Sequence, residues 1–395
     1  MLIRSAQKRM IPILAAMMLL MWVILSALTG VSLYGKSAYN SYTLQALSWL
    51  QGKVTVENVW HLELAVYQDE YYVSFPPLPS VILLPFTLIF GVNTPDNALV
   101  KCYACLAVIL IYKALCARGY DPSVSAPYAF LFAFSSSLLS LTVEGAVWYH
   151  AQVLAFLLTT AAVCALIFDK PTWALFLIAL SVACRPFDAL YLIPVIFAYV
   201  YLELRSGEGI LNVFRRLLPG ILLGLLVAFA IGTYNYARFK SPFEFGHNYL
   251  PEFSTQGGVQ FSLSKVPEHI NPFVIGLPFS LQDGVLKINR FGFSFLIACP
   301  ALLILIVMFV RDLFTRRLNA MKTVLFITFF VHLFLLFMHR TFGAFQYGAR
   351  YCVDLMPYAF FYRLMDDKNS VHKLEWGYLL CTFALSFYGS AMIHL

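Results

Sequence analysis

The chain has 395 residues, of which 61% are hydrophobic, 16% aromatic and only 12% charged. Ordinary soluble domains carry about 25% charged residues, and a single soluble core does not grow large enough to bury this much apolar surface. The composition therefore excludes a soluble enzyme, a nucleic-acid-binding protein, a disordered protein and a small disulfide-stapled protein. It predicts an all-α, polytopic integral membrane protein, in which the distribution of the net charge of +7 matters more than its sum.

Apolar segments follow one another along the whole chain. The first, residues 11–33, comes after the short basic stretch MLIRSAQKRM. It is longer than the roughly 7–15-residue core of a signal peptide and lacks a clear cleavage site, which predicts a retained first membrane helix. Most later segments are near the length of about 20 residues that spans a bilayer. The later segments, of which 172–184 and 351–365 are the short ones, are residues 99–116, 123–142, 150–168, 172–184, 187–204, 217–236, 291–310, 321–338, 351–365 and 374–394.

Residues 76–92 are also apolar, but they contain Pro76, Pro77, Pro79 and Pro85. Proline removes backbone donors and kinks helices, so this stretch is predicted to be a half-buried or re-entrant piece. Leaving it outside the bundle places most basic residues in short loops on one side, which is then the cytoplasmic side. The prediction is about eleven crossings, with the N-terminus in the cytoplasm and the C-terminus outside; twelve crossings are the alternative.

This topology gives a single membrane domain, residues 1–395, with two long polar loops on its outer face, residues 34–75 and 237–290. Loops of this length in a compact helical protein are usually functional, so we expect a site that faces outward. Residues 39–51 of the first loop have the pattern of an amphipathic helix with an aromatic-rich apolar face. Such a helix lies flat in the membrane interface or packs on the bundle.

Carboxylates are concentrated in the first outer loop, at Glu57, Glu63, Asp69 and Glu70. A carboxylate held near the apolar boundary tends to have a raised pKa and can act as a general base, whereas most loop carboxylates are simply solvated. Asp69 and Glu70 are followed at once by Tyr71, Tyr72 and the proline run, which fixes this pair close to the membrane. They are therefore the strongest candidates for the base.

Charged side chains inside or at the edge of the membrane are costly, and they are functional candidates by default. The sites of this kind are Glu144, Arg185 with Asp188, Arg340, and Arg350 with Asp354. Each arginine–aspartate pair has two interpretations. The two side chains neutralise each other, as Arg350 and Asp354 would at i,i+4 spacing on a helix, or the guanidinium holds a phosphate, which its planar fork fits better than other side chains do.

The second outer loop opens with YNYARFKSPFEFGHNYL, residues 234–250, in which aromatic residues alternate with polar and charged ones, His247 among them. This mixture suits a sugar, whose faces are apolar and whose rim is hydroxylated, although an interfacial aromatic belt explains part of it. The spacing of the histidines matches no compact metal motif, so a divalent cation, Mg²⁺ or Mn²⁺, is left open. Cys102 and Cys105 lie within an apolar segment and are interpreted as a packing face.

Several strings, each weak alone, resemble a known family in their order and spacing. They are YYVSFPPLPSVILLPF at residues 71–86, ACRP at 183–186, YNYARFKSPFEFG at 234–246, GFSFLIACPALL at 292–303 and QYGARYCVDLMP at 346–357. Over nearly its whole length the chain resembles the GT-C superfamily, the polytopic glycosyltransferases that use polyprenyl-phosphate-linked sugars. The resemblance is to bacterial members of the dolichyl-phosphate-mannose mannosyltransferase type.

The resemblance implies a transferase that moves a sugar from a polyprenyl phosphate to a glycolipid, a cell-envelope glycan or a protein at the outer face of a bacterial inner membrane, with inversion of the anomeric centre. It also implies a carboxylate base in the first outer loop, for which the candidates are Asp69, then Glu70 and Glu63. Arg185, Arg350 and Arg340 are the expected phosphate ligands, and the side chains expected to line the cavity are those of Tyr71, Tyr72, His150 and His247.

The chain departs from the superfamily at one place. Many members carry an acidic residue soon after the first helix, where this chain reads YGKSAYNSYTLQ and the matching position is Asn40 or a neighbour. Because an amide does not act as a base near neutral pH, the role passes to another carboxylate or the protein lacks activity. Two alternatives therefore stay open, a lipid-linked glycan transporter or flippase and a non-catalytic scaffold subunit. A transporter needs polar groups on both sides of the midplane, whereas the candidates here lie on one side.

Overall fold

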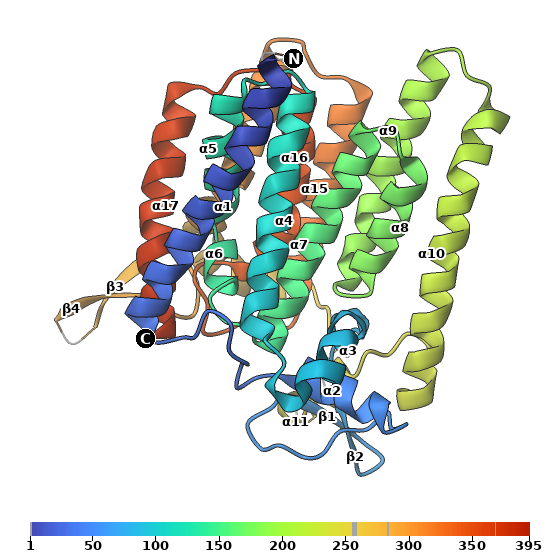
Figure 1. Cartoon of the computed structure of the whole chain (residues 1–395), viewed down its shortest axis with the longest axis vertical. Coiled ribbons are helices and arrows are strands. Elements are labelled where there is room, and N and C mark those ends of the chain that lie inside the picture. The colour runs from blue at the N-terminus through green and yellow to red at the C-terminus, as the bar shows by residue number, and fades with distance from the viewer. Residues whose placement is uncertain (1, 255–258, 283, 368) are drawn as a thin grey trace.

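Long apolar helices form the body of the molecule. The computed structural model describes residues 2–254, 259–282, 284–367 and 369–395. The helices that run through the bundle are α1 (Leu2–Thr29), α4 (Asp96–Ala117), α5 (Pro122–Phe134), α7 (Val147–Ile167), α8 (Pro171–Val182), α9 (Leu192–Arg205), α10 (Ile210–Phe239), α14 (Pro300–Phe314), α15 (Ala320–Met338), α16 (Met356–Leu364) and α17 (Lys373–His394). The N- and C-termini lie at opposite ends of the bundle (Figure 1).

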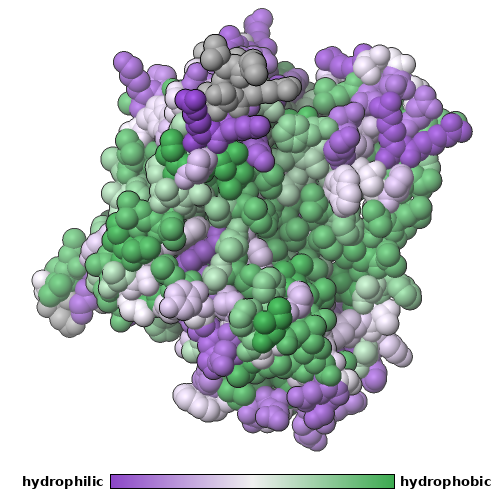
Figure 2. All heavy atoms as spheres, viewed as in Figure 1, coloured by the Kyte–Doolittle hydropathy of each residue, from purple (hydrophilic) through white to green (hydrophobic). Residues whose placement is uncertain are grey.

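A belt of hydrophobic residues is visible on the face of the bundle drawn in Figure 2. Among the described residues, seven helices are long and apolar enough to cross a membrane, and α5 and α8 are shorter apolar helices within the same bundle. On the face shown in Figure 2, hydrophobic residues cover the middle of the molecule and hydrophilic residues gather at its two ends. The chain is therefore an integral, multi-pass membrane protein, and the predicted all-α polytopic fold is confirmed.

Helix boundaries follow local sequence signals. The side chain of Asp121 accepts a hydrogen bond from the backbone N–H of Ser123 at 2.8 Å, and Pro122 takes the first helical position of α5, where its missing N–H costs nothing. α8 ends shortly before Pro186, because the residue before a proline disfavours helical backbone. That residue, Arg185, is extended, with φ −139° and ψ 101°. The break leaves Arg185 between α8 and the 3-10 helix η2 (Pro186–Tyr191).

The segments that join the helices at this end contain the remaining regular structure. The helical elements are α2 (Ser41–Leu50), α3 (Leu78–Phe90), η1 (Gly91–Asn93), α6 (Leu138–Leu141), η2 (Pro186–Tyr191), η3 (His247–Tyr249), α11 (Pro251–Ser254), α12 (Lys265–Ile270), η4 (Asn271–Ile275), α13 (Phe295–Ala298) and η5 (Arg350–Leu355). Two antiparallel hairpins accompany them, β1 (Leu64–Tyr67) with β2 (Glu70–Val73) and β3 (Phe279–Gln282) with β4 (Val285–Ile288). The two long loops of the sequence therefore meet at one end of the bundle (Figure 1).

Helices α2 and α3 lie side by side below the bundle (Figure 1). Within residues 76–92, the helix α3 lies at this end of the molecule. Of the two alternatives for α2, the structure shows the one in which the helix packs on the bundle, because its polar residues face the protein. Thr43 donates to the Asp96 carboxylate at 3.0 Å, and Gln45 donates to the Tyr234 hydroxyl at 2.9 Å and accepts from Ser80 at 2.7 Å. These partners make α2 a helix packed on the bundle rather than one lying flat in lipid.

Candidate active site

Two adjoining cavities open at the end of the bundle where the long loops meet. We call the first the arginine cavity; it has a volume of about 310 Å³ and is lined by Arg185. We call the second the glutamate cavity; it has a volume of about 470 Å³ and is lined by Glu63, Glu144 and Glu252. The side chains that line both cavities are those of Phe75, Trp148, His247, Arg350 and Tyr351. The two cavities therefore share a wall made of aromatic rings, one imidazole and one guanidinium.

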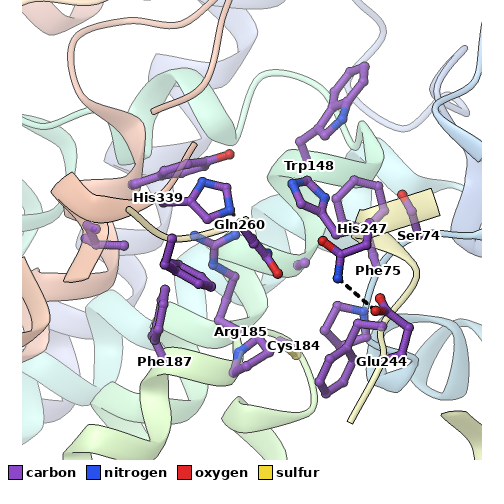
Figure 3. A pocket seen from close by; sticks show the side chains of 18 of the residues that line it. Ser74, Phe75, Trp148, Cys184, Arg185, Phe187, Glu244, His247, Gln260 and His339 are labelled. Atoms are coloured by element: carbon purple, nitrogen blue, oxygen red, sulfur yellow. Dashed lines mark hydrogen bonds between the residues drawn. The ribbon is translucent and has the colours of Figure 1, made fainter. Parts of the chain in front are cut away.

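The arginine cavity is largely aromatic. Phe187, Phe243, Phe245, Phe261 and Leu336 contribute to its apolar wall. Figure 3 shows Arg185, Gln260 and His339 converging from one side of the cavity, with Trp148 and His247 on the other. A cavity with an apolar wall and a cluster of polar groups at one side suits a ligand that has both an apolar and a charged part.

Arg185 is paired with a carboxylate, but not with the one expected. Its Nη2 lies 2.7 Å and its Nε 2.9 Å from Oδ2 of Asp354. The Asp354 Oδ1 also accepts a hydrogen bond from Gln152 Nε2 at 2.9 Å. Asp188, three residues after Arg185, instead accepts a hydrogen bond from Ser181. The guanidinium of Arg185 is also 4.8 Å from the ring centroid of Tyr351, so its position is fixed from two sides.

Arg350 therefore has no ion-pair partner among the described residues. It and Asp354 lie in η5, a 3-10 helix, where residues four apart no longer share a face. This corrects the alternative in which the two side chains neutralise each other. Arg350 is only 7% exposed, and its Nε has no hydrogen-bond partner. Its guanidinium sits 5.6 Å from the ring centroid of Tyr149 and 5.1 Å from that of Tyr351. The result is a buried positive charge between the two cavities that forms no ion pair within the described part of the chain.

Glu63 is the first-loop carboxylate that the fold brings into a cavity. It precedes β1 and is half-buried, and its Oε2 accepts a hydrogen bond from Trp148 Nε1 at 2.6 Å. Burial raises the pKa of Glu63, and Glu252 adds to the rise, while the Trp148 hydrogen bond and the charge of Arg350 oppose it. A carboxylate with a raised pKa is a stronger base than an ordinary one, so Glu63 is suited to take a proton.

Two histidines near the shared wall are neutral. Burial, reinforced by the neighbouring His339, Arg340 and Arg185, lowers the pKa of His247 to about 3. Burial also lowers the pKa of His339 to about 4, against a hydrogen bond with the backbone carbonyl of Thr341. The Nε2 of His247 is buried without a hydrogen-bond partner. Neutral imidazoles here can donate or accept hydrogen bonds to a ligand but bring no charge, which leaves the positive charge to the arginines.

The two leading base candidates lie elsewhere. Asp69 and Glu70 are exposed at the turn of the β1–β2 hairpin, and neither lines the two cavities. Gln68 and Asp69 both have positive φ, 52° and 62°, as the tight turn between two antiparallel strands requires. The prolines do hold this segment near the bundle, but the hairpin directs its turn into solvent. The ranking of Asp69 ahead of Glu63 is corrected by this geometry.

Four other candidates also lie outside the lining of both cavities. Tyr71 sits on β2 opposite Val66, and Tyr72 is buried with its ring centroid 5.2 Å from that of Phe239. His150 is buried on the inner side of α7, between the rings of Tyr42 and Tyr103 at 6.0 and 5.3 Å. The fourth is Arg340, which donates to Asn248 at 2.7 Å and covers the ring of Phe253 at 4.5 Å. These four side chains pack against other parts of the protein, whereas Arg185, Arg350, His247 and Glu63 reach the cavities.

A divalent cation does not fit the residues that the structure describes. No group of three or more His, Cys, Asp or Glu side chains among them could hold a metal ion. Two of the three carboxylates of the glutamate cavity already accept hydrogen bonds: Glu63 accepts from Trp148, and Glu144 accepts from Ser37 at 2.6 Å. We therefore derive no chemical step through a metal.

Comparison with solved structures establishes the fold. The apo oligosaccharyltransferase of Archaeoglobus fulgidus matches with a TM-score of 0.55 at 12% identity, over 96% of this chain and 56% of that one. ArnT from Cupriavidus metallidurans, bound to undecaprenyl phosphate, matches with a TM-score of 0.53 at 13% identity, over 94% and 62% of the two chains. The archaeal oligosaccharyltransferase AglB of A. fulgidus, with an inhibitory peptide and a dolichol-phosphate, gives 0.52 at 13%, over 95% and 55%.

This chain has the GT-C fold. It spans a little over half of the length of the similar chains. No family model matches the sequence, and no curated protein matches it. The structural similarity thus confirms the expected fold. At 12–13% sequence identity, this similarity is evidence for the fold and not for a particular substrate.

Within this GT-C fold, several cavity residues were missed from the sequence. They are Tyr39, Trp148, Glu252, Gln260 and Tyr351. The first four are aromatic or polar residues in connections on the outer side of the predicted topology, and Tyr351 is the first residue of the predicted apolar segment 351–365. Aromatic and polar residues are also abundant in such places where there is no site. Asp354 and Arg185 are 169 residues apart in the sequence, so no local sequence pattern predicts that they pair.

Proposed function

We propose that this protein is an inverting glycosyltransferase that moves a sugar from a polyprenyl phosphate to an acceptor hydroxyl at the outer face of a bacterial inner membrane, with the N-terminus in the cytoplasm. The observation that carries the proposal is the buried, unpaired cation Arg350 between an aromatic cavity and a carboxylate-lined one. The similar structures support the donor class, since ArnT was determined with undecaprenyl phosphate and AglB with a dolichol-phosphate.

The donor occupies the arginine cavity in this proposal. The phosphate lies against Arg350, whose charge no carboxylate within ion-pair distance offsets among the described residues. Arg185 contributes hydrogen-bond donors, but its charge is largely balanced by Asp354. Phe187 and Phe261, whose ring centroids are 5.2 Å apart, offer an apolar surface to the isoprenoid chain. A guanidinium in such a poorly solvated site stabilises phosphate charge much more strongly than it would in water.

The acceptor occupies the glutamate cavity. Its hydroxyl oxygen attacks the anomeric carbon from the side opposite the phosphate, and the new C–O bond forms as the bond from carbon to phosphate oxygen breaks. The electron pair of the broken bond goes to the phosphate, beside Arg350, and the hydroxyl proton goes to the Glu63 carboxylate. A single displacement of this kind inverts the anomeric centre. General-base help contributes about 10²–10⁴-fold to such reactions.

The test is a mass-spectrometric assay of the purified protein in lipid, with polyprenyl-phosphate hexoses and an extract of native glycolipids and glycans. Free polyprenyl phosphate and an acceptor heavier by one sugar are the two products to follow. We expect both from the wild type and neither from Glu63→Gln. Asp69→Asn makes the same carboxylate-to-amide change at an exposed position of the same loop, and it should leave turnover near normal. Full activity of Glu63→Gln would overturn the assignment of the base.

A non-catalytic subunit is the second candidate, and Asn40 favours it. This residue, at the place where many superfamily members have an acid, is the N-cap of α2, and its carbonyl accepts the backbone N–H of Leu44 at 3.1 Å. Donor binding without either product, across several sugars and divalent cations, would support a subunit that keeps the fold and has lost the chemistry.

A further inference from the structure

We propose that four aromatic side chains, Trp60, His61, Tyr39 and Trp148, form a path that guides an extended, uncharged oligosaccharide acceptor from the surface into the glutamate cavity. This inference rests on the proposed transferase function and selects one acceptor class, a glycan chain, from the glycolipids, glycans and proteins considered above. It concerns a surface outside the two cavities, since neither Trp60 nor His61 lines them.

The four rings are continuous in space. The centroids of Trp60 and His61 lie 5.3 Å apart, those of His61 and Tyr39 5.9 Å apart, and those of Tyr39 and Trp148 4.9 Å apart. Trp60 is 92% exposed, whereas Tyr39 and Trp148 are half-buried and line the glutamate cavity. The row therefore begins in solvent and ends beside the base proposed above.

Hydrogen bonds hold the inner part of the path in place. The carbonyl of Tyr39 accepts the backbone N–H of Val147 at 2.9 Å, which ties the first loop to the start of α7. The His61 Nε2 is 3.0 Å from the carbonyl oxygen of Ala38, and the Trp148 Nε1 donates to Glu63. These rings are thus ordered before a ligand arrives, which limits the entropy that binding would cost.

The chemistry of the path matches a glycan. Trp and Tyr combine a large apolar face with a polar group at the edge, and a hexose likewise has apolar C–H faces and a hydroxylated rim. At the end of the path, the carboxylates of Glu63, Glu144 and Glu252 can accept hydrogen bonds from hydroxyl groups. Three carboxylates against the one Arg350 also make this cavity unfavourable for an acceptor that carries phosphate.

A membrane contact explains the exposed Trp60 less well. The segment between α2 and β1 lies beyond the bundle at the end of the molecule in Figure 1. The hydrophobic belt in Figure 2 covers the middle. A lone exposed tryptophan would call for no explanation, but this one continues a row of rings into a cavity.

Binding measured without donor tests the path independently of catalysis. The full chain in lipid nanodiscs is titrated with neutral gluco- and manno-oligosaccharides, as disaccharides and as hexasaccharides, by calorimetry. We expect hexasaccharides of at least one series to bind more tightly than the matching disaccharides. Trp60→Ala should weaken hexasaccharide binding about tenfold, the worth of one good aromatic contact, and leave disaccharide binding unchanged. Tyr34→Ala is the control, because Tyr34 is 75% exposed in the same loop and off the path.

Several results would overturn the inference: no binding by any of these saccharides, equal loss in Tyr34→Ala, or wild-type hexasaccharide affinity in Trp60→Ala. Tighter binding of the 6-phosphorylated forms of the same saccharides would also contradict it. Quenching of tryptophan fluorescence by brominated lipid reports contact between the chain and lipid. If Trp60→Ala reduces this quenching instead of saccharide binding, Trp60 contacts the membrane. Because the binding experiment contains no donor, its outcomes can be interpreted even if the transferase assay fails.

Discussion

The two ends of the bundle differ in how fully their buried charged side chains are paired. At the end near the N-terminus, Asp312 accepts hydrogen bonds from Lys322 at 2.6 Å and Arg311 at 2.7 Å, and Arg363 pairs with Glu375. At the other end, Arg185 is paired with Asp354, but Arg350 is buried without an ion pair among the described residues. A paired charge holds helices together, whereas an unpaired charge in a cavity stores free energy that an anionic ligand can recover. This difference distinguishes the end near the N-terminus from the end that carries the candidate site.

The largest effect on stability is expected at the end near the N-terminus, where the buried charges are paired. Asp312→Asn leaves the side chain of Lys322, which is 3% exposed, without its carboxylate, while Arg311 keeps its second partner, Asp366. Breaking a buried pair from one side costs about 3–5 kcal/mol, so thermal unfolding in detergent should move to much lower temperature. Glu203→Gln, which removes one of the two carboxylates paired with the exposed Arg216, is the control and should cost less than about 1 kcal/mol. Similar unfolding curves for the two variants would contradict the proposed structural role.

Removing the unpaired charge of Arg350 should have the opposite effect, a loss of activity without a loss of stability. Arg350→Gln is expected to lower transfer by about 10²–10³-fold, because the developing phosphate charge loses its main cation. Stability should stay the same or rise, since a buried charge without a partner is removed. Unfolding temperature and turnover, measured on one preparation, check both parts. A variant that unfolds as readily as Asp312→Asn would show that Arg350 is structural.

The pH dependence of transfer should report the state of Glu63. Its pKa is raised by burial, and only the carboxylate accepts a proton, so activity should fall as the pH drops through this raised pKa. Trp148→Phe removes a hydrogen bond that stabilises the carboxylate, which raises the pKa further. The acid limb of kcat/KM should then move up by about one pH unit. Trp173→Phe, an exposed position on α8, should leave the profile in place; an unmoved profile in Trp148→Phe would argue against Glu63 as the base.

The smallest effect is expected at Asn40. Asn40→Asp introduces the acid that the resemblance leads us to expect at this position. The Asn40 side chain makes no capping hydrogen bond to α2, so the helix should persist. If Glu63 acts as the base, turnover should change by less than about twofold, far below the contribution of a general base. A gain of orders of magnitude in the assay would instead show that the early acid is the missing base.

The helices could be predicted from the sequence because apolar length is a local property. Nearly every apolar segment corresponds to a helix, including the short one at residues 172–184, seen as α8 (Pro171–Val182). Arg185 was also recognisable, since a charged residue before a proline, between two apolar segments, marks a helix break at the membrane edge. The face that α2 presents to the protein was not predictable, because its polar side chains are buried only by partners on α3, α4 and α10.

The sequence by itself determined the class of the protein, the course of the helices and the set of charged residues from which a site could be built. Only the tertiary structure decided which of them form it. Asp354 pairs with Arg185 rather than with Arg350, four residues earlier, which leaves Arg350 without an ion pair to any residue that the structure describes. Glu63 reaches a cavity while Asp69 turns into solvent at the hairpin. The reason is physical: burial in a helix follows from nearby residues, whereas the partner of a charge depends on segments that meet only when the chain has folded.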